Sequence, residues 1–417
     1  MIRKTAGTFA VKVSIAAINL IITILLSRWM GAQGKGEASL IIVGITMLML
    51  FCNMIGGAPL IYLVPRYNVF QLAVMSNLWT VVVCTVFYFI LSWSVILPAK
   101  FVLHVCLLTL INSFLSTNVS ILLGKEKIAG NNFILFLQAT INLVVLVVLV
   151  RSFGENNTGS YITSLYVAML TCLFISSILV FNYLKDISFK GSGKIIRELV
   201  RFGFTNQLGH FMNFISFRIS YLLLNKYCLE AGVGVYSNGV SLIESILLIS
   251  NSMATVQYPA IANSSDKAYS QEITIRLTRL NLLLCFFTVL PLLLLPESFY
   301  TWLFGREFEG VKNVILILSP GILFYSMALL IGHYFSGTGK YKINTASNFV
   351  GLIVTVALSS IFLSHYSINV AAAITMASYV AVTGTLFYSF VKDSGIRITA
   401  LIPSFKDLKW AISNFKY

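Results

Sequence analysis

Apolar residues form long continuous runs along the whole sequence, and most charged residues lie in the short stretches between them. Each run approaches the ~20 apolar residues that a transmembrane helix requires. A membrane β-barrel would show short alternating strands instead, so closed helices are the spanning structure that fits. The runs lie near residues 6–27, 39–64, 70–93, 101–123, 132–150, 161–184, 202–225, 236–258, 280–300, 313–336, 346–364 and 368–391. The pattern predicts an all-α polytopic membrane protein with twelve transmembrane helices.

The composition also indicates a membrane protein, since 58% of the 417 residues are hydrophobic and only 10% are charged. Soluble domains carry roughly 25% charged residues. The six cysteines stand singly, without the spacing of a zinc site or a disulfide framework. The Gly-Lys pairs at residues 193–194 and 339–340 lack the Ser or Thr that follows in a phosphate-binding P-loop. We therefore expect no metal, no cofactor and no ATP hydrolysis.

The basic residues predict how the chain is oriented in the membrane. Of its 29 Lys and Arg residues, twenty lie on the side of the N-terminus, seven on the opposite side and two within the apolar runs. Because Lys and Arg concentrate in cytoplasmic loops, we expect both termini to be cytoplasmic. The same distribution accounts for the net charge of +15 without a nucleic-acid partner.

Two short sequence echoes indicate an internal repeat. Residues Gly124–Ile128 resemble Gly339–Ile343, and Gly34–Gly36 resemble Gly232–Gly234. Each echo joins a run to the sixth run after it, so the halves should share one orientation and be related by an axis along the membrane normal. Chance similarity between short Gly-Lys segments is the alternative.

The repeat predicts two six-helix bundles around a central cavity. The first bundle comprises residues 1–190 and the second residues 191–417, and the basic segment 185–201 is the linker between them. Two bundles with a central interface are the usual scaffold for alternating access, in which a site near the middle of the membrane opens to one side and then to the other.

Arg218 and Glu244 lie deep within neighbouring runs. Counted from the turn between them at ~1.5 Å per residue, they reach a similar depth on antiparallel helices and can pair. The pair could be structural and hold the two helices together. Alternatively, Arg218 could face the cavity and bind an anion, with Glu244 tuning it or carrying a coupling proton.

Lys12 is the second base within the apolar runs. Aligning Gly34 with Gly232 places Lys12 opposite His210, so the first helix of each bundle offers a cationic or potentially cationic group toward the same end. Such groups would suit a negatively charged head group. Lys12 could instead extend its ammonium to the interface, and His210 could be a hydrogen-bonded interior histidine.

Gly56, Gly57 and Pro59 interrupt the second run, and we predict a hinge there because lost backbone hydrogen bonds allow bending. Pro291 and Pro320 could act similarly in the second half. Glycine and proline are frequent in transmembrane helices, so a packing role is the alternative.

Four short motifs follow predicted helices, at Arg28–Gly36, Gly232–Ser237, Leu303–Phe308 and Gly337–Lys340. In order and placement they resemble motifs of the polysaccharide flippases in the multidrug/oligosaccharidyl-lipid/polysaccharide exporter superfamily, and the resemblance covers essentially the whole chain. Phe217 is a departure from the pattern, because such proteins often carry an acidic residue before the arginine of the seventh helix.

This resemblance implies movement of undecaprenyl-pyrophosphate-linked oligosaccharides, such as O-antigen repeat units for lipopolysaccharide biosynthesis, across the bacterial inner membrane. Lys12, His210 and Arg218 would then bind the substrate's anionic group. Asn19 and Asn213 would face its sugars, although hydrogen bonding between helices explains asparagines as well. The expected partners are the lipid-linked oligosaccharide, membrane lipids, and polymerase and chain-length proteins of the same pathway.

Two other functions are alternatives. A drug/cation antiporter of the same superfamily should carry buried carboxylates, whereas these runs hold one acid and two bases away from their ends. An integral-membrane polysaccharide polymerase or glycosyltransferase would need a large extramembrane loop, and no loop between the runs greatly exceeds about twenty residues. We therefore expect a transporter of an anionic substrate rather than an enzyme.

Overall fold

The computed structural model describes residues 2–93, 97–154, 156–185, 187, 192–264, 266–396 and 401. Every regular element within these ranges is a helix, which confirms the predicted all-α class. Ten of the described helical segments are long and apolar enough to cross a membrane. The chain is a multi-pass membrane protein.

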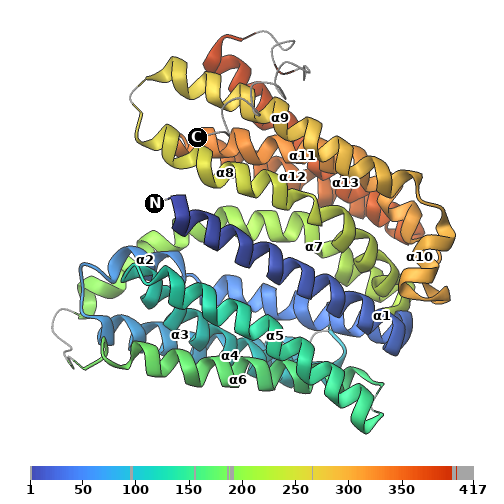
Figure 1. Ribbon diagram of the computed structural model, residues 1–417, viewed down its shortest axis with the longest axis horizontal. Coiled ribbons are helices and arrows are strands. Elements are labelled where there is room, and N and C mark those ends of the chain that lie inside the picture. Colours follow the sequence, from blue (N-terminus) through green and yellow to red (C-terminus); the bar gives the residue numbers. More distant parts are fainter. Residues whose placement is uncertain are drawn as a thin grey trace. The chain divides into compact units, whose positions relative to one another are not determined.

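The helices follow one another along the chain as labelled in Figure 1. The earlier ones are α1 (Ile2–Cys52), α2 (Ala58–Leu63), α3 (Val69–Trp93), α4 (Ala99–Gly124), α5 (Ile128–Phe153) and α6 (Thr158–Phe181). The later ones are α7 (Ser192–Ser245), α8 (Leu247–Ala262), α9 (Lys267–Leu294), α10 (Glu297–Phe304), η1 (Arg306–Phe308), α11 (Val311–Gly337), α12 (Lys342–Ile361), η2 (Leu363–His365) and α13 (Ile368–Ser394).

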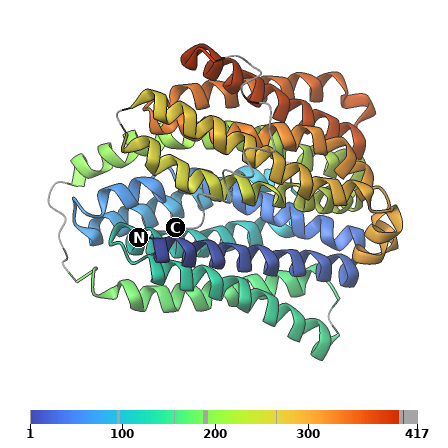
Figure 2. The same cartoon turned by 45° about the horizontal axis from the view of Figure 1, so that its top comes forward.

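α1 and α7 are each interrupted at a single residue. Gly31 breaks α1 with φ 66° and ψ −172°, and Leu229 breaks α7 with φ 57° and ψ −177°. Figures 1 and 2 show the blue ribbon of α1 leaving the N-terminus, turning back about half-way and returning in the opposite direction. At each break a single residue, rather than a loop, separates two of the predicted runs. Each of these two pairs of runs therefore counts as one segment, which gives ten described segments instead of twelve. The count of twelve crossings stays a prediction.

The helices form two compact units. The first unit comprises Met1–Phe211 with Leu229–Gly234, and the second comprises Met212–Cys228 with Val235–Tyr417. The predicted boundary after residue 190 therefore precedes the start of α7, which belongs with the first unit.

The start of α7 packs into an apolar cluster of the first unit. Its buried Ile195 and Leu199 lie in one cluster with Leu60, Leu63 and Leu72 of α2 and α3. This burial is the physical reason why the first turns of α7 separate from the rest of that helix. The division of function between two six-helix halves stays a prediction.

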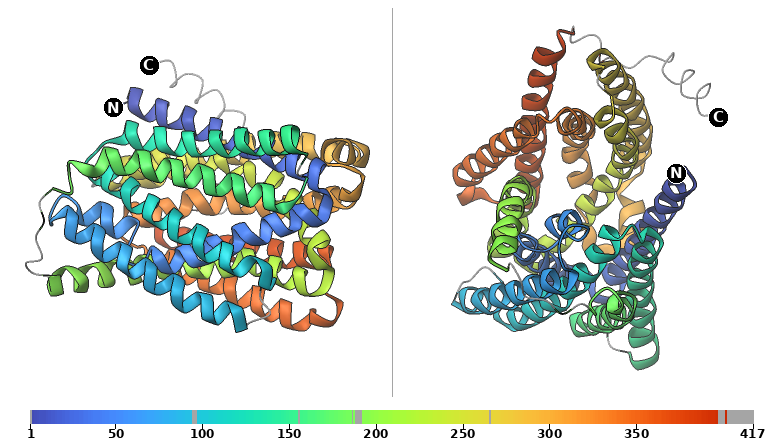
Figure 3. Two further views of the ribbon diagram at one scale, coloured as in Figure 1. Left: turned by 90° about the horizontal axis from the view of Figure 1, so that it is seen from below. Right: turned by 90° about the vertical axis from the view of Figure 1, so that its left-hand side faces the viewer.

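Small polar side chains join the helices of the first unit. The hydroxyl oxygens of Ser76 and Thr117 lie 3.1 Å apart, and those of Thr80 and Ser113 lie 2.8 Å apart. Both bonds connect α3 with α4. Figure 3 shows α3 to α6, coloured from light blue to green, as neighbouring helices. Hydrogen bonds of this kind are typical of helix contacts within a membrane.

α11 is the central helix of the second unit, where it contacts α8, α9 and α13. Gln257 of α8 donates to the Leu330 carbonyl over 3.1 Å, and Asn281 of α9 donates to the Ser326 carbonyl over 3.2 Å. Polar groups in a membrane interior must find partners within the protein. These bonds therefore hold α8 and α9 against α11.

Candidate functional site

Arg218 and Glu244 form a two-point ion pair within the second unit. Nη1 of Arg218 donates to Oε1 of Glu244 over 3.1 Å, and Nη2 donates to Oε2 over 2.6 Å. Both residues belong to α7, on opposite sides of the break at Leu229. Parallel double bonds of this kind are the strong form of arginine–carboxylate contact. The two side chains that the sequence places at a similar depth are thus in direct contact, and the role of the pair stays a prediction.

Two tyrosines adjoin the ion pair. The Tyr379 hydroxyl, on α13, donates to Oε1 of Glu244 over 2.7 Å. The guanidinium carbon of Arg218 lies 5.6 Å from the centre of the Tyr221 ring, a distance at which an aromatic face attracts a cation. In addition to the ion pair itself, Tyr379 therefore holds the carboxylate and Tyr221 holds the guanidinium.

An aromatic cluster packs beside the ion pair. Ring centroids of Phe217 and Tyr379 lie 4.5 Å apart, and Tyr325 of α11 lies 5.1 Å from Phe217 and 4.8 Å from Tyr379. Asn213 donates to the Tyr325 hydroxyl over 3.1 Å. Phe217, where the sequence departs from the pattern expected from the resemblance, is a buried core residue. The carboxylate that meets Arg218 comes instead from the far side of the turn.

Other side chains cover the ion pair only in part, although it lies within a helix that is apolar enough to cross a membrane. The side chains of Arg218 and Glu244 are 31% and 21% exposed. A guanidinium has five N–H donors, and a carboxylate engages only part of them. Arg218 can therefore offer further donors to an anion while it remains paired.

Lys12, Asn19 and His210 all lie on the first unit. Lys12 and Asn19 are exposed on α1, seven residues apart and therefore on one face of the helix. His210 is exposed on α7 rather than interior. Asn213 lies in the second unit with Arg218, where it bonds to Tyr325, whose ring packs against Phe217, the residue before Arg218. A common site that includes residues of the first unit stays a prediction.

The predicted break around Gly56 is present. α1 ends at Cys52 and α2 begins at Ala58, and Gly57 between them has φ 59° and ψ −129°. A positive φ is easily adopted by glycine alone. Pro59 stands in the first turn of α2, where a missing backbone N–H costs little. The backbone is interrupted where the sequence predicts it, and hinge motion stays a prediction.

A group of buried charges that the sequence interpretation missed lies after the break in α1. Glu37 is 7% exposed and accepts hydrogen bonds from Nζ of Lys100 and Oγ1 of Thr158. Lys35, also 7% exposed, donates to Oγ of Ser39 over 3.1 Å. Glu37 thereby ties the first turns of α4 and α6 to α1. The sequence signal for this group is Glu37 itself, an acidic residue that stands directly before an apolar run.

A second unexpected cluster surrounds Asp393 near the end of α13. Its carboxylate pairs with Lys340, lies 3.7 Å from Nζ of Lys267, and accepts from the Tyr334 hydroxyl over 2.7 Å. Lys267 also donates to the Asp393 carbonyl over 2.9 Å. These bonds fasten the ends of α9, α11 and α13 together. Within the described part of the chain, no group of three or more metal-ligating side chains could hold a metal ion.

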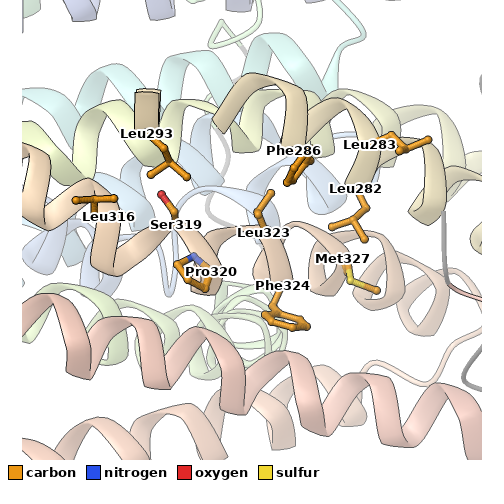
Figure 4. Close-up of a pocket in the computed structure, with 10 residues that line it drawn as sticks. All are labelled: Leu282, Leu283, Phe286, Leu293, Leu316, Ser319, Pro320, Leu323, Phe324 and Met327. Atoms are coloured by element: carbon orange, nitrogen blue, oxygen red, sulfur yellow. The ribbon is translucent and has the colours of Figure 1, made fainter. Parts of the chain in front are cut away.

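An apolar groove of about 490 Å³ lies between α9 and α11 (Figure 4). We call it the α9–α11 groove. α9 lines it with Leu282, Leu283, Phe286 and Leu293, and α11 lines it with Leu316, Ser319, Pro320, Leu323, Phe324 and Met327. It belongs entirely to the second unit. Apart from Pro320, none of the residues that the sequence singled out lies on it.

Solved transporter structures share this fold. A lipid II flippase MurJ in an inward closed conformation has a TM-score of 0.75 at 11% identity, over 99% of this chain and 93% of that chain. An inward-facing multidrug resistance MATE family transporter of the MOP superfamily has a TM-score of 0.71 at 14% identity, over 93% of this chain and 100% of that chain. The likeness confirms the predicted transporter-like helical fold, and these neighbours are transporters rather than enzymes.

The sequence itself matches proteins of polysaccharide biosynthesis. The model of the family described as "Polysaccharide biosynthesis protein" matches residues 67–313, more than half of the chain. The capsular polysaccharide biosynthesis protein CapF of Staphylococcus aureus is 27% identical over 176 residues. That match covers 40% of this chain and 44% of CapF, so the aligned part is less than half the length of this relative.

Proposed function

The chain belongs to this family of polysaccharide biosynthesis proteins, and we propose that it flips undecaprenyl-pyrophosphate-linked oligosaccharides across the bacterial inner membrane. The oligosaccharide would be a repeat unit of O-antigen or of another surface polysaccharide. Movement would proceed by alternating access, with both termini of the chain in the cytoplasm.

The observation that carries this proposal is the accessible Arg218 within a transmembrane helix. A charged group near the bilayer centre costs several kcal/mol unless it is paired or functional. Glu244 satisfies part of the guanidinium, and the 31% exposure of Arg218 leaves donors for a ligand. Arginine is well suited to pyrophosphate because its planar fork binds two phosphate oxygens at once.

The sign of the charges favours an anionic cargo over the drug or cation alternative. Glu244, the acid within the later runs that the sequence singled out, is already engaged by Arg218 and Tyr379. A cation would have to displace a guanidinium from it. Lys12, exposed on α1, adds a second positive charge that the proposal assigns to the same pyrophosphate.

The remaining assignments follow from the same proposal. His210, Asn19 and Asn213 would contact the head group and the sugars. Gly56, Gly57 and Pro59 would supply the bending that alternating access requires. Polymerase and chain-length proteins of the pathway would receive the flipped unit on the outer face.

The test replaces Arg218 by Gln or by Lys, and Lys12 by Gln, in a strain that lacks its own flippase. We expect Arg218→Gln to abolish surface polysaccharide and to weaken binding of undecaprenyl pyrophosphate by about tenfold or more. Arg218→Lys keeps the charge but loses the fork, so it should be intermediate. Arg151→Gln removes an exposed arginine at the end of α5 and serves as the matched control.

Two further variants separate binding from structural pairing. Glu244→Gln removes the competing negative charge, so it should fold and bind pyrophosphate more tightly. The exchange of Arg218→Glu with Glu244→Arg should restore folding if the pair is only structural. Full complementation by monodisperse Arg218→Gln and Lys12→Gln protein would refute the proposed role of both residues.

A further inference from the structure

The α9–α11 groove is built for hydrocarbon, and we propose that it binds the isoprenoid chain of the lipid-linked substrate (Figure 4). This inference rests on the proposed function, because it assigns a place to the chain of a lipid whose pyrophosphate meets Arg218. The ligand is thus a polyprenyl chain, and the site is distinct from the charged one.

Both helices that form the groove carry an internal proline near it. Pro291 lies within α9 and Pro320 within α11. Such a proline removes a backbone hydrogen bond and bends the helix. Pro320 lines the groove directly, and Leu293 enters it two residues after Pro291.

α11 presents one continuous apolar face to this space. Leu316, Pro320, Leu323 and Met327 line the groove at spacings of three or four residues, the period of a single helix face. From Leu316 to Met327 this face is about 16 Å long at 1.5 Å per residue. That length accommodates several isoprene units of an extended chain.

The lining offers nothing to a polar head group. Its members are hydrocarbon or thioether side chains except Ser319, whose hydroxyl already donates to the Ile315 carbonyl over 2.5 Å. A polar ligand would lose its hydrogen bonds to water without replacement. Phe286 and Phe324 add aromatic rings to the wall, so the irregular surface suits a methyl-branched chain better than a straight acyl chain.

The height of the groove along α11 points to the substrate rather than to bulk phospholipid. Phe324 lines the groove, while the next residue, Tyr325, packs against Tyr379 and Phe217 beside the ion pair. The groove and the Arg218 site therefore lie at the same level of one helix. A lipid whose pyrophosphate has reached Arg218 carries the first isoprene units of its chain at this depth, whereas a phospholipid with its head group at the membrane interface presents only the far part of its acyl chains there.

A photo-crosslinking experiment on the full-length protein tests this assignment. Benzoylphenylalanine replaces Phe286, which lines the groove, or its neighbour Phe287, which is 55% exposed and does not line it. The protein is placed in nanodiscs of phosphatidylethanolamine and phosphatidylglycerol with undecaprenyl phosphate. We expect undecaprenyl adducts to be several-fold more abundant at position 286. Equal adducts at both positions, or only phospholipid adducts at position 286, would overturn the inference.

A second variant separates this inference from the proposed function. Leu316→Trp fills the groove from a 43% exposed position, and Ile353→Trp on α12 is the control at a 51% exposed position. We expect Leu316→Trp to weaken binding of undecaprenyl pyrophosphate about tenfold and to leave binding of geranyl pyrophosphate unchanged. If Arg218→Gln left the binding of both pyrophosphate probes unchanged, that result would count against the proposed function. An unchanged affinity for the long-chain probe would count against the groove.

Discussion

The breaks in α1 and α7 have nearly the same backbone conformation but different residues. Gly31 has φ 66° and ψ −172°, and Leu229 has φ 57° and ψ −177°. They are 198 residues apart, the same separation as Gly34 and Gly232 of the sequence echo. The chain therefore makes one kind of turn twice, once with glycine, which adopts this conformation readily, and once with leucine, which is strained in it.

The residues after the two breaks differ more than the breaks do. Lys35 and Glu37 are buried after the first, while Val233 and Val235 are buried at the corresponding positions after the second. Because valines occupy these positions equally well, the turn itself needs no charge there. The charges after Gly31 have a different task, which Glu37 performs by holding α4 and α6.

The contact between the two segments is reciprocal. A Cβ on Gly36 would lie 1.7 Å from the Glu230 carbonyl oxygen, and a Cβ on Gly234 would lie 2.1 Å from the Ala32 carbonyl oxygen. Gly36 and Gly234 are 198 residues apart, and so are Ala32 and Glu230, so the two contacts join equivalent positions of the two segments. Two like segments that contact each other in this way form a self-complementary pair, as across a two-fold axis. This contact concerns the two short segments alone, and the repeat of six-helix halves stays a prediction.

The largest effect should come from breaking this contact. Gly36→Val and Gly234→Val each place a side chain where a backbone oxygen now lies, so each should cost about 3 kcal/mol or more of the free energy of unfolding. The measurement is the apparent melting temperature in detergent, followed by size-exclusion chromatography. Gly384→Ala is the control, because a Cβ there meets nothing within 4 Å. A variant pair that melts like the control would show that the contact is dispensable.

A smaller effect should separate the two buried charges. Glu37→Val copies the second segment but leaves the Thr158 hydroxyl, in a residue only 8% exposed, without its acceptor. We expect a loss of about 2 kcal/mol in the free energy of unfolding. Lys35→Val removes a buried ammonium and should be neutral or stabilising, since buried charges are often replaced without loss by apolar groups. Equal destabilisation by the two changes would contradict the distinction between Glu37 and Lys35.

The sequence predicts the helices well because a membrane leaves few alternatives for long apolar runs. It also predicts the break at Gly57, which depends on neighbouring residues, and the possibility that Arg218 pairs with Glu244, which follows from their similar distance from one turn. The aromatic contacts with Tyr325 and Tyr379 could not be predicted. These residues belong to α11 and α13, far from Phe217 along the chain. Their spacing does not indicate which face of another helix they pack against.

One sequence echo is wrong in register. The sequence pattern matches Gly124 with Gly339, but the hydrogen bonds of the two turns make Gly124 equivalent to Gly337. Lys127 N donates to the Leu122 carbonyl, and Lys340 N donates to the Phe335 carbonyl. The positive φ then falls on Glu126 in one turn and on Gly339 in the other. A Gly-Lys pair marks such a turn without fixing which of its positions the glycine takes.

The smallest expected change in stability comes from exchanging the residues at the two breaks, Gly31 and Leu229. A positive φ costs a non-glycine residue about 1–2 kcal/mol, and glycine loses roughly 0.5–1 kcal/mol more conformational entropy on folding than alanine does. Leu229 is 68% exposed, so its removal sacrifices little packing. Leu229→Gly should therefore stabilise the fold by up to about 1 kcal/mol, and Gly31→Leu should destabilise it by about 1–2 kcal/mol. Both are measured as opposite shifts of the apparent melting temperature. If Leu229→Gly lowers that temperature instead, the leucine side chain contributes more to the turn than its exposure indicates, and the two breaks are not equivalent.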